Sequence, residues 1–74
     1  MNVTHAGMSV TLNGVATDVP AGTATLADLV SVLGLAGKRI AVEMNGEIVP
    51  RSRYATTAVG RGDRLEIVGA VGGG

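Results

Sequence analysis

The fold is decided by the stretch Thr25-Leu26-Ala27-Asp28-Leu29-Val30-Ser31-Val32-Leu33-Gly34, which predicts one short helix between two groups of strands. Thr25 and Asp28 have the spacing of a capping box, in which each side chain accepts a hydrogen bond from the other residue's backbone amide. Leucine and valine then recur every three or four residues, so the helix has one apolar face that must cover a sheet. Gly34 stands where a left-handed residue usually ends a helix. The helix should therefore begin at Leu26 and run for about two to three turns.

Strand patterns lie on both sides of this helix. Residues 8–19 alternate apolar and polar side chains around Asn13-Gly14, a pair that readily adopts the positive φ angles of a type I′ turn. After the helix, residues 40–49 repeat this pattern around Asn45-Gly46. A last alternating run at 64–68 predicts a final strand.

Two strands, a helix and two or three more strands allow few compact arrangements in a chain of 74 residues. A helical crossover favours a parallel, right-handed connection, which places the last strand beside the first in the middle of the sheet. We therefore predict an α+β fold of the β-grasp, or ubiquitin-like, type. Its mixed sheet has four to five strands, with one main helix packed on one face. The predicted domain spans residues 8–68, between an N-terminal extension (1–7) and a flexible C-terminal glycine tail (69–74).

The composition argues against several classes of function. Six lysine and arginine residues balance six aspartate and glutamate residues, so the chain lacks the long-range field that attracts nucleic acids. The absence of cysteine excludes disulfides, thiolate metal sites and cysteine nucleophiles. No apolar run approaches the roughly 20 residues that span a bilayer, and residues 1–7 do not resemble a signal peptide. We expect no nucleic-acid or membrane partner and a cytoplasmic location.

The sequence contains no apparent catalytic constellation. The single histidine, His5, lies in the irregular N-terminal extension, where a surface residue is expected and not a metal ligand or general base. Gly60 and Gly62 precede a strand instead of a helix and lack the spacing of a dinucleotide-binding loop. We therefore expect no catalytic residue, no metal and no bound cofactor.

The irregular segment 51–60 contains candidates for docking a partner. Arg51, Arg53 and Tyr54 combine two cations with the only aromatic residue of the chain. Arginine and tyrosine are enriched at protein interfaces, which favours a docking role. The alternative is a solvated loop in which Tyr54 closes one edge of the core. The sequence leaves both alternatives open.

The last residues are Val71-Gly72-Gly73-Gly74, which we expect to end in a reactive carboxylate. Glycines have no Cβ atom, so three in a row can form a thin ribbon that enters a channel too narrow for side chains. A carboxylate is inert until one oxygen becomes a good leaving group, which implies a partner that activates it with a nucleotide. A frayed chain end is the alternative, and the tail alone favours that alternative.

Two longer stretches connect this tail to a known family. They are Ile40-Ala41-Val42-Glu43-Met44-Asn45-Gly46-Glu47-Ile48-Val49-Pro50-Arg51-Ser52-Arg53-Tyr54, and Gly62-Asp63-Arg64-Leu65-Glu66-Ile67-Val68 at a fixed distance before the terminal glycines. From residue 8 to its end, the chain resembles the ThiS family, the sulfur carrier proteins of thiamin (thiazole) biosynthesis. Many members have a bulky residue just before the final Val-Gly-Gly, where this chain has Ala70.

The resemblance implies a carrier that catalyses nothing itself. An E1-like adenylyltransferase, ThiF, would use ATP to convert the Gly74 carboxylate to an acyl-adenylate, and a sulfur donor would then replace the adenylate to give a thiocarboxylate. Thiazole synthase, ThiG, would receive the sulfur, with Gly72 and Gly73 threading the active-site channels of the partners. Two alternatives remain open: a MoaD-like sulfur carrier for molybdopterin synthesis, and a non-carrier β-grasp interaction module or protein modifier.

Overall fold

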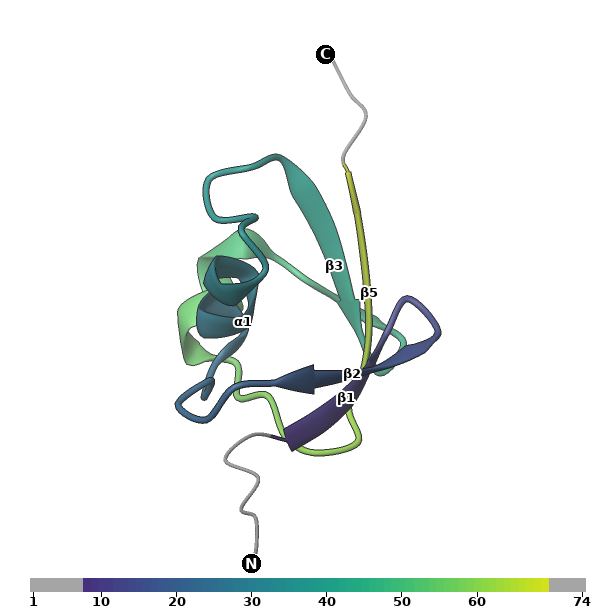
Figure 1. The fold of residues 1–74 in the computed structure, drawn as a ribbon. Coiled ribbons are helices and arrows are strands. Elements are labelled where there is room, and N and C mark those ends of the chain that lie inside the picture. The colour runs from purple at the N-terminus through teal and green to yellow at the C-terminus, as the bar shows by residue number, and fades with distance from the viewer. Residues whose placement is uncertain (1–7, 70–74) are drawn as a thin grey trace, which may run out of the picture.

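A computed structural model describes residues 8–69, which form a five-stranded sheet, an α-helix and a 3-10 helix. Both helices lie on the same face of the sheet (Figure 1). In chain order the elements are β1 (Met8–Leu12), β2 (Val15–Val19), α1 (Leu26–Val32), β3 (Ile40–Met44), β4 (Glu47–Val49), η1 (Arg51–Thr56, the 3-10 helix) and β5 (Arg64–Gly69).

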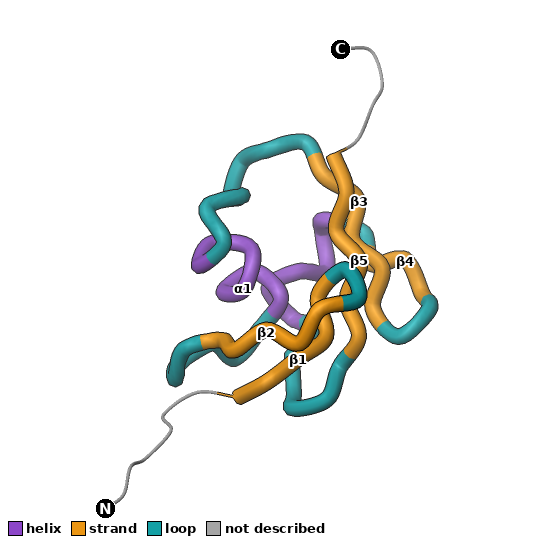
Figure 2. The backbone as a smooth tube through the Cα atoms, turned by 45° about the vertical axis from the view of Figure 1, so that its right-hand side comes forward, coloured by secondary structure: helices purple, strands orange, loops and turns teal. Residues whose placement is uncertain are grey.

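The sheet has the strand order β2-β1-β5-β3-β4. β1 pairs antiparallel with β2 and parallel with β5, whereas β3 pairs antiparallel with both β5 and β4. The last strand therefore lies beside the first in the middle of the sheet, as Figure 2 shows. α1 connects β2 to β3, which run in the same direction. This topology confirms the predicted β-grasp fold.

The predicted capping box begins α1. The Thr25 hydroxyl oxygen accepts a 3.2 Å hydrogen bond from the Asp28 amide, and one Asp28 carboxylate oxygen accepts 3.0 Å bonds from the amides of Thr25 and Ala24. Two amides that the helix itself leaves without partners, those of Thr25 and Asp28, are thereby satisfied, together with the amide of Ala24 before the helix. The helix begins at Leu26, as its sequence predicts.

The C-terminal end of α1 is stopped by Gly34, whose φ of 76° lies in the left-handed region that favours glycine. The Gly34 amide donates to the Ser31 carbonyl at 3.0 Å, and the Leu35 amide donates to the Val30 carbonyl at 2.9 Å. This pair of bonds is the Schellman motif. Because both ends are capped, a helix of only seven residues persists against the sheet.

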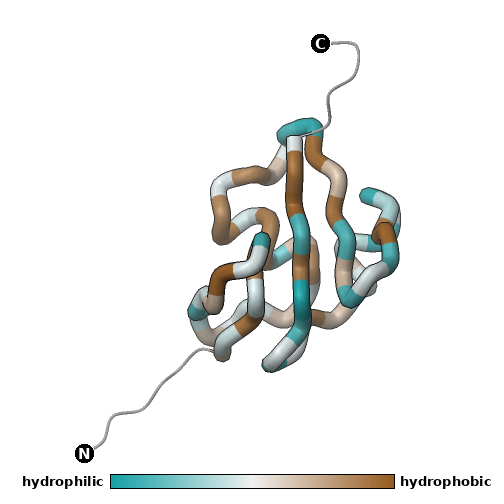
Figure 3. The backbone as a smooth tube through the Cα atoms, turned by 90° about the vertical axis from the view of Figure 1, so that its right-hand side faces the viewer, coloured by the Kyte–Doolittle hydropathy of each residue, from teal (hydrophilic) through white to brown (hydrophobic). Residues whose placement is uncertain are grey.

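The core fills the space between the sheet and the two helices. Its members come from the inward face of the strands, from the apolar face of α1, from η1 and from the loop before β5, and all are aliphatic except one tyrosine. They are Val10, Val19, Leu26, Leu29, Val30, Val42, Tyr54, Val59, Leu65 and Ile67. Buried and exposed residues alternate along the first part of β5. Figure 3 shows the matching alternation of hydrophobic and hydrophilic residues along this strand.

The structure corrects the sequence prediction in two places. Residues 51–56 form the 3-10 helix η1, where we predicted an irregular connection, because the side chain of Tyr54 turns inward and joins the core. Gly69 was predicted to begin the tail but is the last residue of β5, since it pairs with Ile40. The N-terminal extension (1–7) and the rest of the predicted tail (70–74) lie outside the described residues.

A first prediction concerns the charge of Asp28. Hydrogen bonds from the amides of Thr25 and Ala24 lower the pKa of Asp28 from its ordinary value of 3.8. A lowered folded-state pKa gives stability that is present above the unfolded-state pKa and is lost as the pH falls through the folded-state value. We expect Asp28→Asn to be less stable than the parent protein at neutral pH, with a difference that shrinks as the pH falls below 3.8 and disappears below the lowered folded-state pKa. Urea unfolding at several pH values measures this.

The control is Thr25→Val, which removes the uncharged half of the same capping box. It should cost about 1 kcal/mol of unfolding free energy at neutral and acid pH alike. A destabilisation by Asp28→Asn that is equally large at both pH values would contradict the assigned role of the charge.

Candidate functional site

β5 is the strand that leads into the glycine-rich end of the chain, so its anchoring determines where that end leaves the domain. On one side, β3 pairs with β5 from Leu65 to Gly69. On the other side, β1 pairs only with Arg64 and Leu65. The backbone of β5 beyond Leu65 therefore needs a different partner on the β1 side.

The side chain of Asn13 supplies this partner. Its Nδ2 donates to the Ile67 carbonyl at 3.1 Å, and its Oδ1 accepts from the Ile67 amide at 2.8 Å. The side-chain amide thus supplies one donor and one acceptor to Ile67, beyond the point where the pairing of β1 with β5 ends. The Asn13 backbone amide also donates to the Leu65 carbonyl at 2.8 Å. One turn residue therefore holds β5 at two points.

Asn45, in the second Asn-Gly turn, holds the start of β5. Its Oδ1 accepts from the Arg64 amide at 2.9 Å, and its Nδ2 donates to a carboxylate oxygen of Asp63 at 3.1 Å. The other carboxylate oxygen of Asp63 accepts a 2.7 Å bond from the Gly60 amide, which closes the turn before the strand. Both asparagines adopt the positive φ predicted for the turns, 51° for Asn13 and 52° for Asn45. Sequence reasoning found the turns but missed the bonds to β5.

The three predicted docking residues occupy different environments on η1. Arg51 is exposed, and its Nη2 donates to the Lys38 carbonyl at 3.4 Å. Arg53 is also exposed. Tyr54 is only 8% exposed and belongs to the core, which is the second of the two alternatives that the sequence left open. Docking of a partner by Arg51 and Arg53 stays a prediction.

The residues predicted to carry the chemistry, Gly72, Gly73 and Gly74, lie outside the described part of the chain. Within residues 8–69, no group of three or more histidine, aspartate or glutamate side chains is arranged to hold a metal ion. No buried side-chain nitrogen or oxygen of the same residues lacks a hydrogen-bond partner. No helix in this part of the chain is long and apolar enough to cross a membrane.

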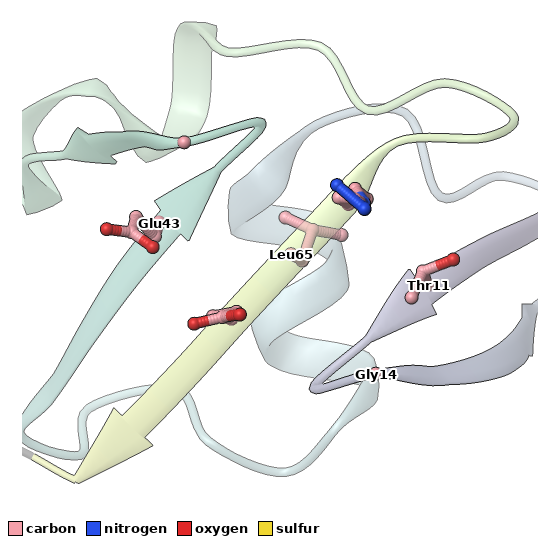
Figure 4. A pocket seen from close by; sticks show the side chains of 7 residues that line it. Thr11, Gly14, Glu43 and Leu65 are labelled. Carbon is pink, nitrogen blue, oxygen red and sulfur yellow. The ribbon is translucent and has the colours of Figure 1, made fainter.

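A polar hollow lies on the face of the sheet opposite the helices. It measures about 390 Å³ and crosses β1, β5 and β3 (Figure 4). The side chains of Thr11 and Glu43 point to this face. The hollow is lined by Thr11, Gly14, Glu43, Gly46, Arg64, Leu65 and Glu66. It is a shallow surface across three strands and contains no nucleophile paired with a base.

Residues 7–74 match the model of the ThiS family. The chain belongs to the ThiS family. A crystal structure of the thiamine biosynthesis protein ThiS from Geobacter metallireducens is 33% identical and has a TM-score of 0.78, with 90% of this chain and 100% of that chain covered. A solution structure of a thiamine biosynthesis protein from the same organism has a TM-score of 0.73. The match covers 90% of this chain and 88% of that chain. The β-grasp fold of this ThiS-family chain is thus shared with solved members.

Two curated relatives of this ThiS-family chain are much longer proteins. A thiazole synthase of Paramagnetospirillum magneticum is 52% identical over 50 residues, which are 68% of this chain and 15% of the relative. A thiazole synthase of Magnetococcus marinus is 39% identical over 67 residues, which are 90% of this chain and 20% of the relative. The chain therefore spans between one seventh and one fifth of these relatives.

A second prediction tests the anchoring of β5 by Asn13. Asn13→Gly keeps the positive φ of the turn but leaves the partly buried amide and carbonyl of Ile67 without partners. We expect a loss of about 1–3 kcal/mol in unfolding free energy and faster hydrogen exchange at the Ile67 amide. Chemical denaturation and exchange measured by NMR test this.

Asn45→Gly is the matched control, because it makes the same backbone change at the other Asn-Gly turn. It should speed exchange at the Arg64 amide and leave Ile67 protected. Unchanged protection of Ile67 in Asn13→Gly would show that the side-chain bonds do not hold the strand.

Proposed function

We propose that this ThiS-family protein is a sulfur carrier of thiamin biosynthesis. In this proposal Gly74 ends in a carboxylate that is adenylated, converted to a thiocarboxylate and used as the sulfur source for thiazole formation. The observation that carries the proposal is the match to the ThiS family over residues 7–74, which includes the glycines at the end of the sequence. The likeness to a solved ThiS protein over 90% of the chain supports it.

The geometry of the described domain suits a carrier. β5 lies in the centre of the sheet and is held by β3 on one side and by β1 and Asn13 on the other. A rigid strand directly before the glycine-rich end gives that end a defined starting point. Glycines without side chains then suit entry into a narrow channel, where a partner performs the chemistry.

The proposed activation has two steps. First, a ThiF-like adenylyltransferase joins the Gly74 carboxylate to the α-phosphorus of ATP and releases pyrophosphate. Next, the terminal sulfur of a persulfide on a donor protein attacks the acyl-adenylate and releases AMP. A thiol then cleaves the resulting acyl disulfide, which leaves the thiocarboxylate on Gly74 and a disulfide on the donor. ATP is bound by the activating partner, so the carrier needs no cofactor of its own. Because the activation consumes ATP, we place the carrier in the cytoplasm.

A ThiG-like thiazole synthase is the proposed recipient of the sulfur. The two curated relatives named thiazole synthase support this partner, because each contains a segment similar to this chain within one long polypeptide. The carrier itself is not an enzyme in this scheme but the co-substrate of two enzymes.

Intact mass after incubation with a ThiF-like enzyme, ATP and a sulfur source tests the proposal. A carrier gains the mass difference between sulfur and oxygen, whereas an interaction module or a protein modifier does not. A thiocarboxylate that supports thiazole formation but not pterin formation distinguishes this carrier from a MoaD-like one. An unchanged mass in the presence of an active enzyme would refute the proposal.

A third prediction concerns the glycine end. Deletion of Gly74, or Gly73→Phe, should abolish adenylation, because the carboxylate is displaced or a side chain blocks the channel. Circular dichroism and the melting temperature should not change, since both residues follow β5 in the sequence. Pyrophosphate release measures adenylation, and normal release from the shortened chain would remove Gly74 from the mechanism.

A fourth prediction concerns the exposed arginines of η1. Exchanging Arg51 and Arg53 together for glutamate should slow association with the ThiF-like or ThiG-like partner, and high salt should reduce the difference. Lys38→Glu is the control, because it also replaces a positive charge by a negative one, at a residue next to Arg51. Stopped-flow association rates that are equal for the double variant and the parent protein would assign both arginines to a solvated surface.

A further inference from the structure

The second Asn-Gly turn, Asn45-Gly46, places a side-chain amide beside an accessible backbone nitrogen. Both residues are exposed. A Cβ atom built on Gly46 would meet no other atom within 4 Å, so the space around this glycine is open. Among the described residues, the Gly46 amide donates no hydrogen bond. Its nitrogen is therefore available to attack the neighbouring side chain of Asn45.

The reaction that this arrangement allows is deamidation, which requires only water. The Gly46 nitrogen forms a bond to Cγ of Asn45, the bond from Cγ to Nδ2 breaks, and ammonia leaves with the proton of the Gly46 amide. The product is a cyclic succinimide. Water then opens the ring at either carbonyl carbon and gives aspartate or isoaspartate. In sum, a side-chain amide and a water molecule become a carboxylate and an ammonium ion.

The first turn, Asn13-Gly14, is the same dipeptide in the same conformation and serves as an internal reference. The φ angles are 51° at Asn13 and 52° at Asn45, and both side-chain amides are bonded through both of their polar atoms. The surroundings of these bonds differ, because those of Asn13 are partly buried and those of Asn45 are exposed.

This difference in exposure sets the reactivity of the two sites. To reach the succinimide geometry, each side chain must leave its hydrogen-bond partners and turn toward the following glycine. At Asn13 that movement strands the amide and the carbonyl of Ile67 in a partly buried place, which is costly. At Asn45 water can replace the exposed bonds. Asn45 is therefore the more reactive asparagine in the folded protein.

Deamidation of Asn45 would change an attractive contact into a repulsive one. The Asn45 Nδ2 donates to Oδ1 of Asp63 at 3.1 Å. A carboxylate oxygen in its place cannot donate, so two like charges would face each other there. Asp63 also accepts the 2.7 Å bond from the Gly60 amide that closes the turn before β5. A displaced Asp63 would open this turn, and isoaspartate would in addition lengthen the main chain of the Asn45-Gly46 turn.

We propose that Asn45-Gly46 is a modification site, at which spontaneous deamidation loosens the start of β5. The reacting groups are the protein's own side-chain amide and water, and the product is a second carboxylate beside Asp63. The inference uses only described residues and does not rest on the proposed function. It gives the folded domain a chemical lifetime, because an aged chain holds β5 less firmly at Arg64 than a new one.

The test of the site compares both Asn-Gly pairs within one molecule. The full chain is incubated at mildly alkaline pH, and peptide mapping by mass spectrometry follows the replacement of NH2 by OH at each asparagine. In the folded protein we expect Asn45 to be converted at least about tenfold faster than Asn13. In guanidinium chloride that unfolds the chain, the two rates should be similar, because the surrounding structure is lost.

The test of the consequence uses Asn45→Asp, which is one of the two products. Hydrogen exchange measured by NMR should become at least about tenfold faster at the amides of Gly60 and Arg64, while Ile67 keeps its protection. The matched rescue is the double variant Asn45→Asp, Asp63→Asn, which restores one amide and one carboxylate at the contact. Exchange in this variant should return to that of the parent protein.

The possible results decide both parts of the proposal. A folded chain in which Asn13 reacts as fast as Asn45, or in which Asn45 stays intact while the unfolded chain is converted, would overturn the assigned site. Parent-like exchange in Asn45→Asp, or no recovery in the double variant, would overturn the assigned repulsion. None of these results bears on the proposed function, which the intact mass after sulfur loading tests separately.

Discussion

The structure depends on the fixation of β5 in the centre of the sheet. β3 pairs with this strand up to Gly69, while β1 covers only its start and the side-chain amide of Asn13 binds Ile67 beyond that point. The same strand supplies Leu65 and Ile67 to the core. Burial of these apolar side chains therefore fixes β5 in addition to its backbone hydrogen bonds. A central strand that is hydrogen-bonded on both sides gives a fixed position to the point where the following residues leave the domain.

Most of the fold was predictable because its signals are local. The capping box of Thr25 and Asp28, the stop at Gly34 and the two Asn-Gly turns each need only a few neighbouring residues, and the structure contains them all. The 3-10 helix η1 was not predictable in this way. It depends on the burial of Tyr54 against α1, which is a tertiary contact and leaves no periodic pattern in the segment.

The site was predictable to a smaller extent. The sequence predicts Asn13 only as a turn residue. Its hydrogen bonds to Ile67 join residues 54 positions apart, so they could not be predicted without the arrangement of the strands. The sequence did indicate the ThiS family through the segment 40–54 and the final glycines, since these features are contiguous. Family membership and the anchored strand together support the proposal that the domain presents a carboxyl group and that partner proteins perform the chemistry.

The most direct measurement of the central claim is a single-turnover transfer of labelled sulfur. The carrier is first loaded with isotopically labelled sulfur, freed of the donor and ATP, and then mixed with thiazole synthase and its other substrates. The account predicts that the label leaves Gly74 and appears in the thiazole in equal amount, as followed by mass spectrometry of both species. A thiazole formed without label, while the carrier keeps its sulfur, would contradict the account.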